Sequence, residues 1–162
     1  MEDKPAKQIK WCFKIKDGLK MQNPNDEISK SYLDLAKSSL KRAEETLKSK
    51  DYLWATIIIY YSEYYALYSF LQKIGIKCEN HACSISAVKF LLGEEKVKTI
   101  EEHKDRRIDA QYYLKTQDEN ALEEMLRNAK TFVAEFDNII SNTSDEEIGS
   151  FRKKLDQLTT NI

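Results

Sequence analysis

One stretch, residues 51–74, constrains the fold of this chain more than any other. Between Asp51 and Gly75 nearly every residue is apolar or aromatic, and no turn residue interrupts the run. Asp51 is a favourable N-cap and Gly75 a favourable left-handed stop, so the pattern predicts a single helix. A buried β-strand is the alternative interpretation of residues 57–61, but the uninterrupted run of 51–74 is far longer than strands usually are. A helix that is apolar on every side belongs at the centre of a bundle.

The same stretch is not expected to span a membrane. Glu63 lies at its centre, and its many tyrosine hydroxyls need hydrogen-bond partners. The 162 residues are enough for one domain, and the scarcity of Gly (4) and Pro (2) favours long helices with few turns. A net charge of −1 gives no general attraction to nucleic acid. Residues 1–25 are too charged for a signal peptide, which predicts a cytoplasmic protein.

The cysteines do not form a recognisable metal motif. Cys12, Cys78 and Cys83 are odd in number and contain no CxxC pair. Cys78 and Cys83 flank His81, but a zinc site needs further ligands and only His103 remains. We therefore expect no metal and no cofactor, and we expect all three thiols to be free and buried in a reducing compartment.

The hydrophobic pattern predicts an all-α, up-and-down bundle of four to five main helices with an extra C-terminal helix. The expected division is an N-terminal lead (1–25), the helical bundle (26–142) and a C-terminal helix (143–162). In the lead, we expect residues 1–8 to be loose, and residues 9–20 form either a short helix or an extended hook. The main helices are expected over 26–49, 51–74, 82–92, 95–114 and 121–140.

Two apolar stripes indicate how the outer helices pack. The stripe of the first long helix has 3.6-residue spacing and consists of Ile28, Tyr32, Leu35, Ala36, Leu40, Ala43 and Leu47. The C-terminal helix starts with a capping box, Ser144 with Glu147. Its seam is narrow and consists of Ile148, Phe151, Leu155, Leu158 and Ile162. Such a seam packs on one neighbour, so this helix is either a lid or an oligomer contact.

Several charged and polar residues are candidates for a site. Glu63 in an apolar helix needs a partner, and we predict a contact with Arg107, with a tyrosine hydroxyl as the alternative. His103 and Arg107 are four residues apart and face one way on a helix. Arg106 and Arg107 either pair with acidic neighbours or contact a ligand. His81 either bonds a loop carbonyl or contacts a phosphate. The tyrosines of the central helix form core and interface, or a base-stacking platform.

The order of these parts resembles the HEPN superfamily of small helical bundles. Residues 31–47 are similar to the family's first helix, with Ala36, Leu40 and Ala43 in place. The other matching motifs are Tyr60-Tyr61-x-x-Tyr64-x-Ala66, Gly75-x(5)-His81, Arg107-x-x-Ala110-x-Tyr112 and Ala129-x-x-Phe132. The resemblance covers about residues 28–140.

This resemblance implies a helical bundle that commonly dimerises. It also implies pairing with a minimal nucleotidyltransferase, often as a toxin–antitoxin pair. Many family members are metal-independent ribonucleases with an Arg-x(4–6)-His motif, in which the guanidinium grips phosphate and the imidazole moves a proton. Here no Arg precedes a His at that spacing, and the nearest substitute is Lys77 with His81.

We therefore expect a nucleotide- or RNA-associated binding and interaction module rather than an enzyme, forming a homodimer and partnering a nucleotidyltransferase. The expected ligand-binding residues are Glu63, His81, Arg106, Arg107 and Tyr112. One alternative is a metal-independent endoribonuclease that uses His81 or His103 with Arg107. Another is a purely structural oligomerisation module, in which the tyrosines are buried and the backbone satisfies His81.

Overall fold

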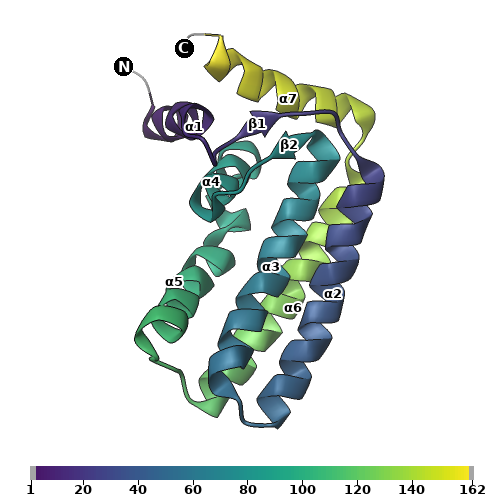
Figure 1. Cartoon of the computed structure of the whole chain (residues 1–162). Coiled ribbons are helices and arrows are strands. Elements are labelled where there is room, and N and C mark those ends of the chain that lie inside the picture. Colours follow the sequence, from purple (N-terminus) through teal and green to yellow (C-terminus); the bar gives the residue numbers. More distant parts are fainter. Residues whose placement is uncertain (1–2, 161–162) are drawn as a thin grey trace.

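The computed structural model describes residues 3–160, and the described chain folds mainly into helices (Figure 1). The all-α bundle predicted from the sequence is confirmed. In chain order the elements are α1 (Lys4–Lys14), β1 (Lys20–Met21), α2 (Asp26–Lys48), α3 (Tyr52–Ile74), β2 (Ile76–Lys77), α4 (His81–Leu92), the 3-10 helix η1 (Glu94–Lys96), α5 (Lys98–Tyr113), α6 (Glu119–Asn142) and α7 (Asp145–Thr159). None of these helices is both long and apolar enough to cross a membrane.

Helix α3 is the centre of the molecule. It runs beside α2 and α6, with α5 on another flank and α4 and α7 near its C-terminal end (Figure 1). The Asp51 carboxylate accepts a hydrogen bond from the Trp54 amide at the start of α3, and Gly75 ends the helix at φ +80°. Both caps confirm the sequence prediction. Most α3 residues are buried, because other helices cover several of its faces.

The core is built around large side chains of α3. Phe70 packs edge-on against Phe136 of α6 and Phe151 of α7, with ring centroids 6.4 and 5.6 Å apart. Buried aliphatic residues of α4 and α6 complete the main cluster. Helix α7 packs as a lid through Ile148 and Leu155, one of the two predicted arrangements. Ile162, the last residue of the predicted seam, lies outside the described residues.

The N-terminal lead is more ordered than its sequence suggests. We expected residues 1–8 to be loose, but 4–8 belong to α1, which buries Ala6, Ile9 and Cys12 on one side. Met1 and Glu2 lie outside the described residues. Of the two alternatives for residues 9–20, a helix is found, and it is followed by a short antiparallel pairing of β1 with β2. The pairing sets Lys20 opposite Lys77, a contact between distant segments that local patterns do not reveal.

The expectation of three free thiols is wrong. Cys12 of α1 and Cys83 of α4 form a disulfide with a Cα–Cα distance of 5.6 Å, and only Cys78 among the three is free. The two bonded cysteines are 71 residues apart in the sequence. Their pairing depends on how α1 docks against α4, and cysteine spacing carries no information about that docking.

Two helices differ from their predicted patterns. In α2, Ile28 and Leu35 belong to the predicted apolar stripe but are exposed, whereas Leu33 is buried. Helix α2 packs against α3 and α6, and its buried residues include Leu33, Ala36, Ala43 and Leu47. The helix predicted over 95–114 is divided into η1 and α5, because Val97 at φ −116° and ψ 0° separates them.

Candidate functional site

Three helices converge at the buried side chain of Tyr60. Its hydroxyl is 2.9 Å from Nδ1 of His81, the first residue of α4. The guanidinium carbon of Arg107, on α5, lies 4.7 Å from the centre of the Tyr60 ring. Burial raises the pKa of the Tyr60 hydroxyl, so it stays protonated at neutral pH. Tyr60 therefore contacts both His81 and Arg107, two of the residues predicted from the sequence to bind a ligand.

His81 is held by rings on α3. It stacks on Tyr64 with centroids 3.7 Å apart, and Tyr61 approaches it edge-on at 5.7 Å. Burial, followed by the positive charges of Arg107 and Lys104, lowers the pKa of His81 to about 4. The imidazole is therefore neutral at pH 7. The side chain is partly exposed. Among the described residues its Nε2 has no hydrogen-bond partner, and because this atom is not fully buried it can contact solvent.

Asn80 helps to position His81 by capping the N-terminus of α4. Its side-chain oxygen accepts a hydrogen bond from the Cys83 amide at 3.0 Å, which makes Asn80 the N-cap of α4. Asparagine is among the residues most favoured at this position. Gly75 and the β2 strand precede it, so the turn after α3 brings the first residue of α4 back against the tyrosines of α3.

Arg107 is a buried cation with an unused donor. It is only 8% exposed, and its Nη1 donates a hydrogen bond to Gln111 Oε1 at 3.2 Å. Its Nε has no hydrogen-bond partner in the described part of the chain. A buried, unpaired guanidinium donor costs free energy unless a ligand or water occupies it. Because guanidinium groups suit phosphate oxygens, Arg107 favours an anionic ligand.

Glu63 pairs with His103 and not with Arg107, so that predicted contact is wrong. Glu63 Oε1 is 2.6 Å from His103 Nδ1, both side chains are almost completely buried, and Glu63 Oε2 is unpaired. Burial raises the pKa of Glu63 to about 7, while the hydrogen bond and charge of His103 act in the opposite direction. Arg107 lies one turn beyond His103 on α5, at the level of Tyr60, which explains the different pairing.

The remaining predicted residues lie around these two contacts. Arg106 is half-buried, and its charge slightly lowers the pKa of Glu63. Tyr112 is 66% exposed on the last turn of α5, and no ring contact joins it to Tyr60 within the described chain. The structure thus brings His81 and Arg107 together, and it brings Glu63 and His103 together. Lys104, which also faces His81, was missed, although its position beside His103 was a usable signal.

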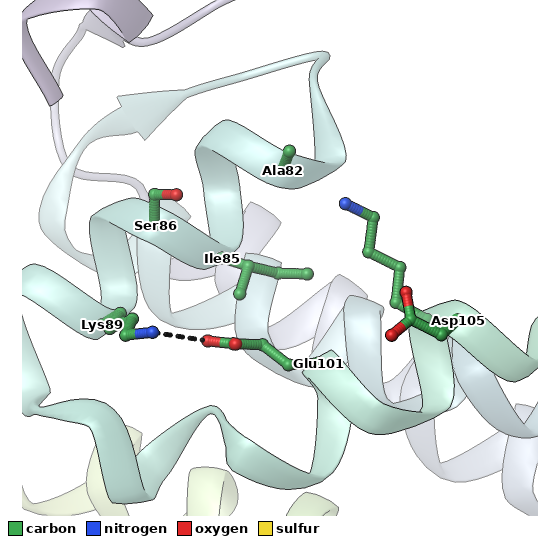
Figure 2. A pocket seen from close by; sticks show the side chains of 7 residues that line it. Ala82, Ile85, Ser86, Lys89, Glu101 and Asp105 are labelled. Atoms are coloured by element: carbon green, nitrogen blue, oxygen red, sulfur yellow. Dashed lines mark ion pairs between the residues drawn. The ribbon is translucent and has the colours of Figure 1, made fainter. Parts of the chain in front are cut away.

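A groove lies between α4 and α5 (Figure 2). Its volume is about 270 Å³, and its lining residues are Ala82, Ile85, Ser86, Lys89, Glu101, Lys104 and Asp105. Figure 2 shows the Lys89–Glu101 ion pair, 3.2 Å long, which joins the two helices. The lining includes Ala82, the residue after His81, but not His81, Tyr60 or Arg107. Residues 3–160 contain no group of three or more His, Cys, Asp or Glu placed to hold a metal ion.

Comparison with sequence models of known families matches the HEPN domain over residues 29–139. The chain belongs to the HEPN domain family. This confirms the resemblance noted from the sequence, at nearly the same boundaries. No curated protein and no solved structure gives a significant match. The matched range of this HEPN domain contains Tyr60, Glu63, His81, His103 and Arg107, whereas α1 and α7 lie outside it.

Proposed function

We propose that this HEPN domain is a nucleotide- or RNA-binding and interaction module whose phosphate contact is Arg107, with His81 beside it. The observation that carries the proposal is that both residues meet at Tyr60 while Arg107 keeps a buried donor unpaired. An arginine offers planar, charged donors that fit phosphate oxygens. The Nε2 of His81 adds a neutral polar contact next to Tyr60.

Binding is favoured over catalysis because His81 is a weak base. Metal-independent RNA cleavage needs one group to accept the 2′-hydroxyl proton and another to protonate the leaving oxygen. With its pKa lowered to about 4, His81 is neutral at pH 7 and has little tendency to take up a proton. Its Nδ1 is also occupied by the Tyr60 hydroxyl. The absence of the Arg-x(4–6)-His spacing points the same way.

A metal-independent endoribonuclease remains the second candidate, for one specific reason. His81 and Arg107 converge, as a cleaving pair would have to do. His103 is the weaker base for such a reaction, because it is 1% exposed and bound to Glu63. A purely structural role fits less well, since His81 bonds a side-chain hydroxyl and Arg107 is left with an unpaired donor.

The proposal includes a homodimer and a protein partner. The outer side of α2 and α3 carries exposed apolar residues, among them Ile28, Leu35 and Trp54. Tyr32 and Tyr65, whose rings lie 6.1 Å apart, connect the two helices there. A second copy of the chain covering this side would bury these residues and place two Arg107 clusters in one assembly. From its family we also propose a minimal nucleotidyltransferase as partner, as in toxin–antitoxin pairs, and a cytoplasmic location.

The binding test uses a fluorescent single-stranded RNA and ATP as separate probes. We expect Arg107→Gln to weaken binding about tenfold or more, because a charge-assisted hydrogen bond contributes about 1.5–3 kcal/mol. The slope of log affinity against log salt should fall by about 0.7 per lost phosphate contact. Arg127→Gln, at an exposed arginine on α6, is the matched control. Equal affinities and salt slopes for wild type and Arg107→Gln would refute the phosphate contact.

Cleavage of a mixed RNA pool in EDTA separates the two candidates. The binding module predicts no cleavage by wild type. Cleavage that persists in EDTA and disappears in both His81→Ala and Arg107→Ala, but not in His103→Ala, would establish the ribonuclease instead. Circular dichroism of each variant shows whether a loss of activity comes from unfolding.

A further inference from the structure

The disulfide joins the N-terminal helix to the turn that carries His81. Cys12 lies in the last turn of α1, and Cys83 lies in the first turn of α4, two residues after His81. Both cysteines are fully buried. The Cys83 amide also donates the capping hydrogen bond to Asn80. The bridge is therefore attached to the structural element that positions His81.

Besides this bridge, α1 is held by one short buried face. It is an 11-residue helix whose buried side chains are Ala6, Ile9 and Cys12. Trp11 on the same helix is half exposed. Helix α1 lies against α4 and α7 at one end of the molecule (Figure 1) and outside the matched domain. A helix of this length is marginal by itself, so its docking depends strongly on the covalent link.

The third cysteine cannot easily replace either partner. Cys78 is buried, and burial raises the pKa of its thiol, so little reactive thiolate forms. Its Sγ is 3.2 Å from the Asn80 carbonyl oxygen, which accepts a hydrogen bond from the thiol. Breaking the Cys12–Cys83 bond therefore leads to two free thiols rather than to an exchanged disulfide.

We propose that the Cys12–Cys83 disulfide is a redox-sensitive latch whose reduction releases α1 and loosens the first turn of α4. The reductant is a dithiol, either a protein or a small molecule. One of its thiolates attacks a bridge sulfur, the S–S bond breaks, and the departing cysteine thiolate takes up a proton. The second thiol resolves the mixed disulfide. Two electrons pass to the protein, Cys12 and Cys83 become thiols, and the reductant leaves as a disulfide.

The burial of both sulfurs couples this reaction to movement of α1. A reductant reaches the bond only when a local opening around the bridge exposes a sulfur, and once the bond is broken α1 is no longer covalently held against α4. His81 precedes Cys83 by two residues, so release of α1 makes the first turn of α4, and with it His81 of the proposed ligand site, more mobile. This last consequence rests on the proposed function, whereas the release itself does not.

Hydrogen–deuterium exchange of the full chain tests the latch. We compare oxidised wild type, wild type reduced with dithiothreitol, and a Cys12→Ser/Cys83→Ser variant. Cys78→Ser, which keeps the bridge, is the matched control. Reduction and the double substitution are expected to raise exchange at least about tenfold in residues 4–14, and measurably in 81–83, while α6 stays protected. Alkylation in denaturant should label one cysteine before reduction and three after it.

Unchanged protection of residues 4–14 after complete reduction would overturn the latch, since the bridge would then only add stability. Release of α1 without any change in 81–83 would refute the link to the site. RNA binding in both redox states is measured separately. If oxidised protein binds no RNA while exchange responds to reduction, the proposed function fails and the latch stands. If the double variant does not fold, the reduced wild type decides.

Discussion

Replacing Glu63 with alanine removes one member of a buried pair and is expected to destabilise the bundle strongly. His103 would lose its only hydrogen-bond partner within the described chain. Removal of the Glu63 carboxylate would also create a cavity beside His103 of α5. Breaking a buried pair of this kind costs about 3–5 kcal/mol. For a chain of this size, each kcal/mol lowers the melting temperature by about 2–4 °C, so a decrease of roughly 6–20 °C is expected.

Glu63→Gln is the matched control for this substitution. Glutamine keeps the volume of the side chain and an oxygen that can accept a hydrogen bond from His103 Nδ1. Glu63→Gln is expected to lower the free energy of unfolding by about 1 kcal/mol, because a neutral amide oxygen replaces a carboxylate in one hydrogen bond. Urea unfolding followed by circular dichroism at pH 7 measures both values. Equal stabilities of the alanine and glutamine variants would show that the Glu63–His103 contact does not stabilise the fold.

The same pair makes stability depend on pH in a defined direction. Burial raises the pKa of Glu63 from 4.5 to about 7, so between these values the folded state holds a proton that the unfolded state has released. The contribution of Glu63 is fully present below pH 4.5 and is lost as the pH rises through 7. Relative to Glu63→Gln, wild type should lose up to about 3 kcal/mol over this range. An opposite trend in the difference between the two proteins would refute the assignment.

Three further substitutions test the framework around the site. Gly75→Ala is expected to cost about 2–3 kcal/mol, because Gly75 has φ +80° and an added Cβ would lie 2.5 Å from the Gln22 carbonyl oxygen. Gly149 on α7 has open space around it, so Gly149→Ala should instead stabilise the protein by about 0.5–1 kcal/mol. Urea unfolding measures both changes. Asn80→Ala should cost about 1 kcal/mol through loss of the α4 cap and raise amide exchange at Cys83, whose N–H donates to the Asn80 side chain; unchanged exchange there would contradict the capping role. Arg152→Gln should lower the unfolding free energy by about 1–3 kcal/mol, because Arg152 Nη1 donates to the carbonyls of Ile74 and Gly75 at the end of α3 and to that of Gln22 after β1. A loss below about 0.5 kcal/mol would show these bonds to be weak.

Part of the site was predictable because its determinants are local. The Asn80 cap, the stop at Gly75 and the position of Arg107 on a helix follow from short patterns. The pairing of side chains between helices was not predictable in this way. Glu63 was expected to meet Arg107, yet it meets His103, because a difference of one helical turn in how α5 lies against α3 changes the partner. Hydrophobic periodicity does not specify that offset.

The sequence by itself determined the all-α bundle, the central position of residues 51–74 and the family of the domain. These features depend on periodicity and on motifs along one chain segment, which is information that neighbouring residues carry. Only the tertiary structure decided that Cys12 pairs with Cys83, that β1 pairs with β2, and that His81 and Arg107 meet at Tyr60. Each of these contacts joins segments far apart in the sequence. They depend on how whole helices dock, and that docking is set by the summed packing of the core rather than by any local pattern.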